Sequence, residues 1–250
     1  MRRAARRGPA AGVLIALLCL PATGAWAGED GIPGAAPAAV ASPGAAPSAP
    51  PACPAPEEIV RQLQARYDQT RAFRAGFVQE TLVLALGERD QQRGTVAFQK
   101  PGRMHWTFTA PTRQEIISDG ATLWIYQPAE RQVLKAAFEA AFVSTTPVSF
   151  LAGVGRINDD FRVASGARAC TAERAYVLLV PKNGQNLGSL ELTVDRSAWD
   201  ILGATVTDPL GNVTTVTFED LERNVEIPVE AFTFEVPDGV DVIHAPGMLE

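Results

Sequence analysis

The residue types that most often perform chemistry in proteins are few in this chain and widely spaced. Its two histidines are His105 and His244, and neither stands near a cysteine at a spacing typical of a zinc site. We expect His244 to lie in a loose tail. The acidic residues do not gather into the clusters that a carboxylate metal site requires. We therefore expect no metal ligand and no bound cofactor.

Potential nucleophiles are equally isolated. No Gly-x-Ser-x-Gly elbow is present, and Ser144, Ser149 and Ser165 have no histidine nearby in the sequence. Gly153 and Gly155 lack the third glycine of a dinucleotide-binding loop. The sequence thus nominates no catalytic residue, which favours a binding function over an enzyme. A hydrolase that depends on an unrecognised serine remains an alternative.

The first 27 residues predict export. Four arginines precede the apolar run AGVLIALLCLPAT, and the segment ends on Ala25-Trp26-Ala27, the small residues that a signal peptidase reads. We interpret residues 1–27 as a cleaved secretory signal that contains Cys19, and we expect an exported protein. Removal of the signal leaves 18 basic and 28 acidic residues, a net charge of −10, which repels nucleic acid.

Cys53 and Cys170 are the cysteines that remain after the signal. An even pair in an exported chain is compatible with one disulfide between the start of the folded region and a distant hairpin. A disulfide and two free thiols both stay open as alternatives, because the sequence does not show whether the two sulfur atoms meet.

Composition divides the chain into three segments. Residues 28–56 are almost wholly Ala, Pro, Gly and Ser, which predicts a flexible linker. Residues 57–250 then suit one domain. A helix is expected to begin near Pro56, with Ile59, Leu63 and Tyr67 on its apolar face.

From residue 73 onward the apolar period changes to two, which predicts strands. Turn residues separate eleven runs, at 76–86, 93–99, 103–109, 114–118, 122–127, 131–135, 160–164, 174–181, 187–194, 200–207 and 213–220. Short connections of this kind join antiparallel neighbours, so we expect a single meander. Residues 136–155 interrupt the pattern and predict one or two short helices, the second opened by Thr146-Pro147.

The stretch QKPGRMHWTFTAP places Met104, Trp106 and Phe108 on one face of a strand. These side chains could form an ordinary core or line a cavity. His105 alternates with them and is expected to be an exposed strand residue. In LWIY, residues 123–126, both faces of a strand are apolar, and the direction of Trp124 and Tyr126 stays open. A sheet with one wet face would not need so many apolar residues.

Several dispersed blocks carry a resemblance to a known family. They are FRAGFVQ at 73–79, GTVAFQKPGRMHW at 94–106, SDGATLWIYQP at 118–128, the Thr146-Pro147 helix and FTFEVPDGV at 232–240. In this order the blocks resemble the periplasmic lipoprotein carrier family LolA, from about residue 57 to 243.

The resemblance implies a mostly β (α+β) fold, an incomplete antiparallel β-barrel or half-barrel with helices that form a lid over an apolar concave face. It also implies a monomeric carrier of acylated lipoproteins that works between an inner-membrane ABC exporter complex and an outer-membrane receptor. A periplasmic module that senses lipid or lipoprotein with the same half-barrel is the alternative.

The resemblance further implies which residues act. The family's lid is held by a basic residue before the proline that opens the aromatic strand, and here that residue is Lys100. A lysine lacks the planar fork of an arginine, so we expect a looser lid. The expected lipid-binding residues are Leu63, Tyr67, Met104, Trp106, Phe108, Ile116, Leu123, Phe150 and Leu151.

Overall fold

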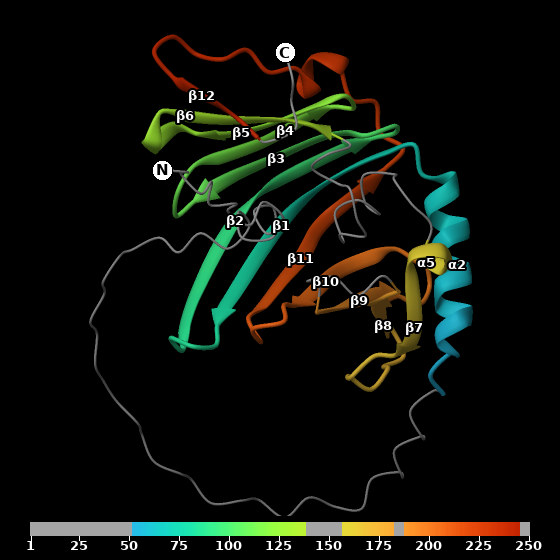
Figure 1. The fold of residues 1–250 in the computed structure, drawn as a ribbon. Coiled ribbons are helices and arrows are strands. Elements are labelled where there is room, and N and C mark those ends of the chain that lie inside the picture. The colour runs from blue at the N-terminus through green and yellow to red at the C-terminus, as the bar shows by residue number, and fades with distance from the viewer. Residues whose placement is uncertain (1–51, 139–156, 183–187, 246–250) are drawn as a thin grey trace, which may run out of the picture.

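The chain folds into one curled sheet with a long helix beside it (Figure 1). The computed structural model describes residues 52–138, 157–182 and 188–245. The helices are α2 (Pro56–Gln69), α5 (Ile157–Asp160), η1 (Pro128–Glu130) and η2 (Val229–Phe232). The strands are β1 (Ala72–Val83), β2 (Glu88–Gln99), β3 (Arg103–Ala110), β4 (Gln114–Asp119), β5 (Thr122–Gln127), β6 (Gln132–Ala137), β7 (Phe161–Ser165), β8 (Arg174–Pro181), β9 (Ser189–Asp195), β10 (Ile201–Thr207), β11 (Val213–Arg223) and β12 (Asp241–His244).

The expected single meander is wrong, although its eleven strands are present. The sheet order is β12-β6-β5-β4-β3-β2-β1-β11-β10-β9-β8-β7, so two meanders, β1 to β6 and β7 to β11, join where β1 pairs with β11. After β6 the chain re-enters the sheet at its far edge, which a count of short turns does not reveal. All of these pairs are antiparallel, whereas β12 runs parallel to β6.

The helix α2 forms where the sequence predicts it. Pro56 occupies an early position, Glu57 and Glu58 lie at the positive end of the helix dipole, and Arg66 lies near the negative end. The helix ends at Thr70, whose backbone is extended. Its buried residues Ile59, Val60 and Leu63 pack against β7, β8 and α5.

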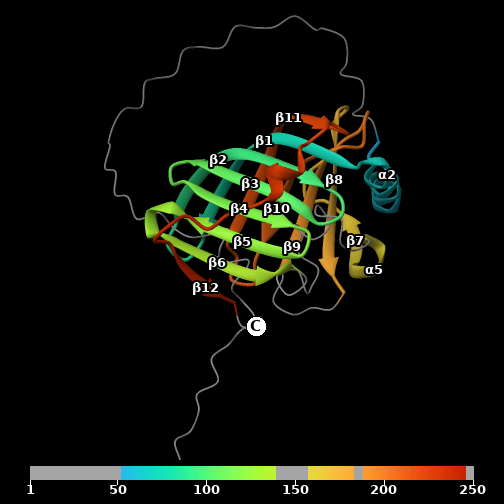
Figure 2. The same cartoon turned by 90° about the horizontal axis from the view of Figure 1, so that it is seen from above.

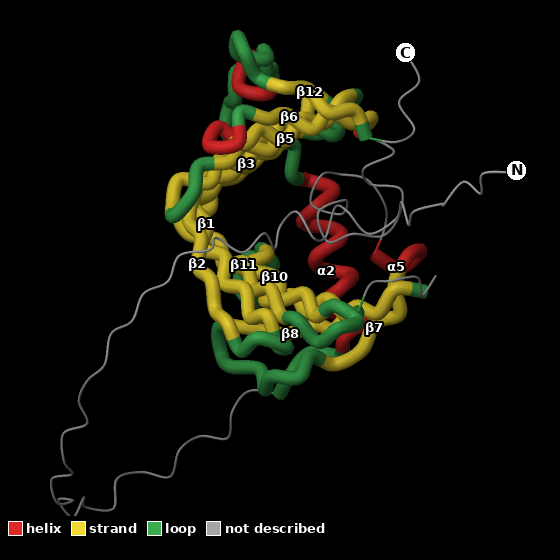
Figure 3. Tube along the Cα trace, turned by 60° about the vertical axis from the view of Figure 1, so that its left-hand side comes forward, coloured by secondary structure: helices red, strands yellow, loops and turns green. Residues whose placement is uncertain are grey.

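The sheet curls so that the two meanders face each other across a concave side, which Figure 3 shows end-on. Seen from above, β3 to β6 lie side by side on one half, while α2 and α5 lie at the other end of the sheet (Figure 2). The expected half-barrel, mostly β, is confirmed, whereas a lid of helices over its concave face stays a prediction. Among the described residues, no helix is both long enough and apolar enough to span a bilayer.

The interior divides into two large apolar clusters. One belongs to the first meander and β11, and it contains many of the phenylalanines. The other lies between α2, α5 and the strands β7 to β10, and it consists mainly of aliphatic side chains. Ile201 in β10 packs against both clusters, so it marks the boundary between them.

The C-terminal segment covers the outer, convex face of the first meander and corrects two expectations. His105 is not an exposed strand residue, because its Nδ1 lies 2.8 Å from the Ala231 carbonyl oxygen and its Nε2 lies 3.2 Å from a Glu115 carboxylate oxygen. His244, expected in a loose tail, lies in β12 and pairs with Lys135. The Glu115 contact joins the neighbouring strands β3 and β4, whereas the contacts with Ala231 and of His244 form because residues 225–245 fold back over β3 to β6.

The same segment resolves the direction of the LWIY strand. Trp124 and Tyr126 face outward, with ring centroids 6.2 and 5.5 Å from that of Phe234. Leu123 and Ile125 face inward and are buried in the first cluster. Both faces of the strand are therefore apolar because a protein layer covers each of them.

Some expectations fall outside the described residues. These are the signal at 1–27, most of the linker, the helices expected within 139–155, and the lipid-binding positions Phe150 and Leu151. The predicted linker extends to residue 56, whereas in the structure Cys53 is bonded to the domain and α2 begins at Pro56.

Candidate functional site

A narrow cleft opens on the concave side, between the C-terminal half of α2 and the sheet. Its cavity volume is about 50 Å³, and its walls are mostly apolar. It is lined by Leu63, Arg66, Tyr67, Thr70, Phe73, Trp199, Asp200, Ile201, Phe218, Leu221 and Arg223. The cleft lies at the boundary between the two apolar clusters, because it has wall residues from each and Ile201 from both.

An aromatic layer supports the sheet side of the cleft. Phe73 and Phe218 line the cleft and meet edge to face, with centroids 6.4 Å apart. Behind them Trp106 lies 6.2 Å from Phe218 and 4.8 Å from Phe77. Such pairs add stabilisation beyond the area that they bury. A group that separates Phe73 from Phe218 would therefore enter a continuous aromatic interior.

The structure places the expected lipid-binding residues in two positions. Leu63 and Tyr67 line the cleft. Met104, Trp106 and Phe108 lie behind its wall and are 1%, 5% and 2% exposed. Ile116 and Leu123 belong to the same buried cluster. Contact of these five with an acyl chain stays a prediction, because it requires the cleft to widen.

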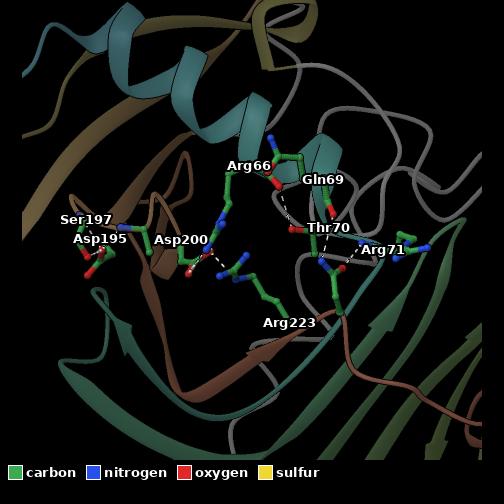
Figure 4. A network of polar contacts seen from close by, with 10 residues as sticks. Arg66, Gln69, Thr70, Arg71, Asp195, Ser197, Asp200 and Arg223 are labelled. Atoms are coloured by element: carbon green, nitrogen blue, oxygen red, sulfur yellow. Dashed lines mark hydrogen bonds and ion pairs between the residues drawn. The ribbon is translucent and has the colours of Figure 1, made fainter.

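Three charged side chains close the rim of the cleft (Figure 4). Arg66 of α2 donates from Nε to Asp200 Oδ1 at 3.0 Å, and Arg223 of β11 places its Nε 2.9 Å from the same oxygen. The Asp200 side chain is only 14% exposed. Burial raises the pKa of this carboxyl above its ordinary value, and the hydrogen bond from Arg66 opposes the rise. One carboxylate thus ties the helix to the sheet.

Lys100 holds the end of the same helix from the β2–β3 turn. Its ammonium donates to the Tyr67 carbonyl oxygen at 2.5 Å and lies 3.3 Å from the centroid of the Tyr67 ring. That carbonyl belongs to the last turn, where cations are favoured. Burial lowers the pKa of Lys100, against the opposing field of Asp68, and burial also raises the pKa of the Tyr67 phenol. A lysine holds one carbonyl here, where a guanidinium could hold several.

Further polar contacts fix the junction between α2 and β1 (Figure 4). Thr70 donates from its hydroxyl to the Arg66 carbonyl oxygen at 2.9 Å. Asn224, just after β11, accepts from the Arg71 amide at 2.8 Å and donates to the Gln69 carbonyl oxygen at 3.3 Å. The carbonyl groups at the end of the helix are therefore satisfied by Thr70 for Arg66, by Lys100 for Tyr67 and by Asn224 for Gln69.

The other end of α2 is held covalently. Cys53, three residues before the helix, forms a disulfide with Cys170 in the β7–β8 connection, and their Cα atoms are 5.4 Å apart. Arg196 adds hydrogen bonds to the Thr171 carbonyl oxygen at 2.6 Å and to the Ala52 carbonyl oxygen at 3.2 Å. Of the two states that the sequence left open, the structure contains the bonded one.

Sequence reasoning missed most of the cleft's lining. Phe73 could have been nominated, since Phe73, Ala75 and Phe77 share one face of β1 and open a block that carries the family resemblance. Phe218 could have been nominated in the same way, from its place on one face of its own strand. The group Arg66, Asp200 and Arg223 had no signal, because its members come from three elements that only the folded chain brings together.

Known proteins are similar to this chain over most of its length. The family described as outer membrane lipoprotein carrier protein LolA matches residues 68–235, about two thirds of the chain. An outer-membrane lipoprotein carrier protein of Chromobacterium violaceum is 30% identical, with 77% of this chain and 90% of that protein covered. An outer-membrane lipoprotein carrier protein of Chromohalobacter salexigens is 31% identical, with 74% of this chain and 87% of that protein covered.

Two further comparisons are with a curated protein and with a solved structure. The outer-membrane lipoprotein carrier protein of Hahella chejuensis is 32% identical, with 74% of this chain and 87% of that protein covered. The crystal structure of a LolA superfamily protein from Nitrosomonas europaea is similar with a TM-score of 0.41, at 14% identity, over 73% of this chain and 99% of that chain. From the family match and the curated relatives, this chain belongs to the outer membrane lipoprotein carrier protein LolA family.

Proposed function

We propose that this protein carries acylated lipoproteins across the periplasm. It accepts them from an inner-membrane ABC exporter complex, buries their acyl chains on the concave side of the half-barrel, and releases them to a receptor at the outer membrane. No covalent catalysis is involved. The family membership supports the cargo class, and the apolar cleft beside the boundary residue Ile201 supports the mode of binding.

The need for a carrier follows from the chemistry of the cargo. Burial of one CH₂ group is worth about 0.8 kcal/mol, so three long acyl chains exposed to water would cost on the order of tens of kcal/mol. Such a cargo cannot cross an aqueous compartment uncovered. An apolar cleft that widens into an aromatic interior offers this cover.

The small size of the cleft in this structure fits reversible binding. A volume of about 50 Å³ holds a few water molecules and not three acyl chains. Loading must therefore separate α2 from the sheet, which breaks the contacts of Asp200 and Lys100. This cost lowers the affinity for cargo, so that transfer to a tighter-binding receptor is downhill.

Site-specific photo-crosslinking tests the proposal. Protein with a photoreactive phenylalanine derivative at position 67 is incubated with spheroplasts, and lipoprotein release and crosslinking are measured. A derivative at position 124, an aromatic site on the opposite face, is the matched control. We expect released lipoprotein that is crosslinked from position 67 and not from position 124.

Two outcomes would count against the proposal. The carrier function fails if no lipoprotein is released and no acyl chain can be extracted from the protein. The cleft is the wrong site if lipoprotein is released but crosslinks equally from both positions.

A further inference from the structure

The largest exposed apolar side chains of the described residues include three leucines at one end of the sheet. Leu84 and Leu86 lie in the β1–β2 turn and are 58% and 66% exposed, and Leu210 lies in the β10–β11 turn and is 81% exposed. Figure 1 shows both turns at the same end of the sheet, away from η2 and the C-terminal segment. We call Leu84, Leu86 and Leu210 the leucine tip.

The two turns of the leucine tip are in contact. The Leu84 amide donates to Asn212 Oδ1 at 3.0 Å, and a Cβ atom added at Gly211 would lie 2.7 Å from Leu84 Cδ2. Asp208 fixes the second turn, since its Oδ1 accepts from the amides of Leu210 and Asn212 at 2.8 and 2.9 Å. The leucines are therefore presented by an ordered pair of turns.

The backbone amides of the three leucines all have hydrogen-bond acceptors within the protein. Each leucine amide donates a hydrogen bond within the tip: Leu84 to Asn212, Leu86 to the Val83 carbonyl oxygen at 3.2 Å, and Leu210 to Asp208. A donor that loses water without a partner costs free energy, and a lipid environment offers few replacement acceptors. These three amides would leave water without that cost.

We propose that the leucine tip inserts into the surface of a lipid bilayer. A stable protein interface needs about 800 Å² and some 20–30 residues on each side, which three leucines on two protruding turns do not supply. A bilayer requires no matching shape, and its affinity for a protein grows with the apolar area that enters it. The exposed leucines therefore match a bilayer better than a folded partner.

Charge selects the kind of bilayer. Glu88 and Asp208 lie next to the leucines with Arg89, and the chain expected after removal of residues 1–27 carries a net charge of −10. Anionic headgroups therefore add no attraction, and the contact depends on apolar burial. We expect binding to zwitterionic vesicles that anionic lipid does not strengthen and that salt does not weaken.

The inserted tip is separate from the cleft. Phe73 lies at the start of β1 and the leucine tip at its end, so roughly 35 Å of strand separates them. Contact at the tip tethers the protein to a membrane and leaves the concave side unchanged. The inference goes beyond the proposed carrier function, and variants of the tip should keep their cargo binding.

Sedimentation with pure phosphatidylcholine vesicles tests the inference, with the exported protein and its Leu84→Ser/Leu86→Ser/Leu210→Ser variant. Because these side chains are exposed, the variant should fold normally, which circular dichroism and thermal unfolding check. Loss of even one buried leucine weakens partitioning by about tenfold, so we expect at least that loss. Val236→Ser, an exposed apolar residue outside the tip, is the control and should bind like the wild type.

The inference is overturned by any of three results: a wild type that does not sediment with vesicles, a triple variant that sediments as well as the wild type, or binding that needs phosphatidylglycerol and low salt. Loss of a protein partner by the triple variant with unchanged vesicle binding would also overturn it, in favour of a protein docking site. Photo-crosslinking from position 67 should be the same in the triple variant and the wild type.

Discussion

Asp200 is the residue whose protonation state bears most directly on the cleft. Its carboxylate contacts both Arg66 and Arg223, yet burial raises its pKa. The folded protein therefore takes up this proton at a higher pH than the unfolded chain. As the pH falls through that window the folded state binds more protons, so the contribution of this group to the free energy of unfolding rises while its ion pairs are lost. Acidification through that window should loosen the rim of the cleft without unfolding the protein.

Asp200→Asn tests this expectation. The substitution keeps the shape and one acceptor oxygen but exchanges a charged hydrogen bond for a neutral one, a loss of about 1 kcal/mol or about fivefold in favour of the open cleft. We expect stronger binding of a fluorescent apolar dye at neutral pH, and a smaller increase on acidification than in the wild type. Dye titrations at a series of pH values measure both.

Asp195→Asn is the matched control for that measurement. Asp195 is the last residue of β9, where the β9–β10 turn begins, but its carboxylate accepts from Ser197 and Ala198 within the turn, and these bonds lower its pKa. The Asp195 charge is the smallest of the causes that act on the pKa of Asp200, so the control should keep the increase in dye binding on acidification and shift it only slightly, to lower pH. An unchanged pH dependence in Asp200→Asn would show that other groups control the cleft.

Among the elements, α2 depends on the disulfide that precedes it. Cys53 and Cys170 are 117 residues apart, and a bond that closes so long a loop restricts the unfolded chain strongly. The variant Cys53→Ser/Cys170→Ser should lose about 4 kcal/mol of unfolding free energy, measured by urea denaturation. Reductant should shift the wild-type curve toward that of the variant and leave the variant's own curve unchanged. A wild-type curve that does not respond once both thiols are shown to be free would refute this expectation.

The helices and strands also show how much of the fold can be predicted from the sequence. Apolar periods located α2 and eleven strands, because residues that face a core repeat at the spacing of their own element. The pairing of β1 with β11 did not follow, since neighbours in a sheet need not be neighbours in the chain. β12 was missed because its four residues are all exposed and lack the alternation that marks a half-buried strand.

The candidate site was predicted only in part, for the same physical reason. Leu63 and Tyr67 lie on one helix face, so the period of α2 revealed them. Asp200 has no periodic signal, because its role depends on Arg66, 134 residues away. Side chains that act through long-range charge contacts leave no pattern in their own segment.

At the scale of the molecule, three tryptophans report on three regions. Trp199 lines the cleft, Trp106 lies behind its aromatic wall, and Trp124 lies beneath the C-terminal segment on the opposite face. Loading should change the surroundings of the first two and leave the third as it was. Trp124 therefore serves as an internal control for Trp199 and Trp106.

Three variants, each with a single tryptophan and phenylalanine at the other positions, make this comparison measurable. We expect a shift of the emission maximum on addition of an acylated lipopeptide for Trp199 and Trp106, and none for Trp124. Unfolding of each variant is followed in parallel, since Trp→Phe within the core costs some stability. A shift confined to Trp124 would place the binding site on the convex face.

The two ends of α2 are held by bonds of very different strength. A covalent bond fixes the chain just before the helix, while an ammonium and a carboxylate hold its last turn. The last turn also runs directly into β1, which begins at Ala72, so α2 has a covalent restraint at each end. Loading therefore moves the last turn away from the sheet only as far as Thr70 and Arg71 allow. In an oxidising compartment the disulfide also fixes the first end of the helix, whereas in a reducing compartment the link into β1 would be the remaining covalent restraint.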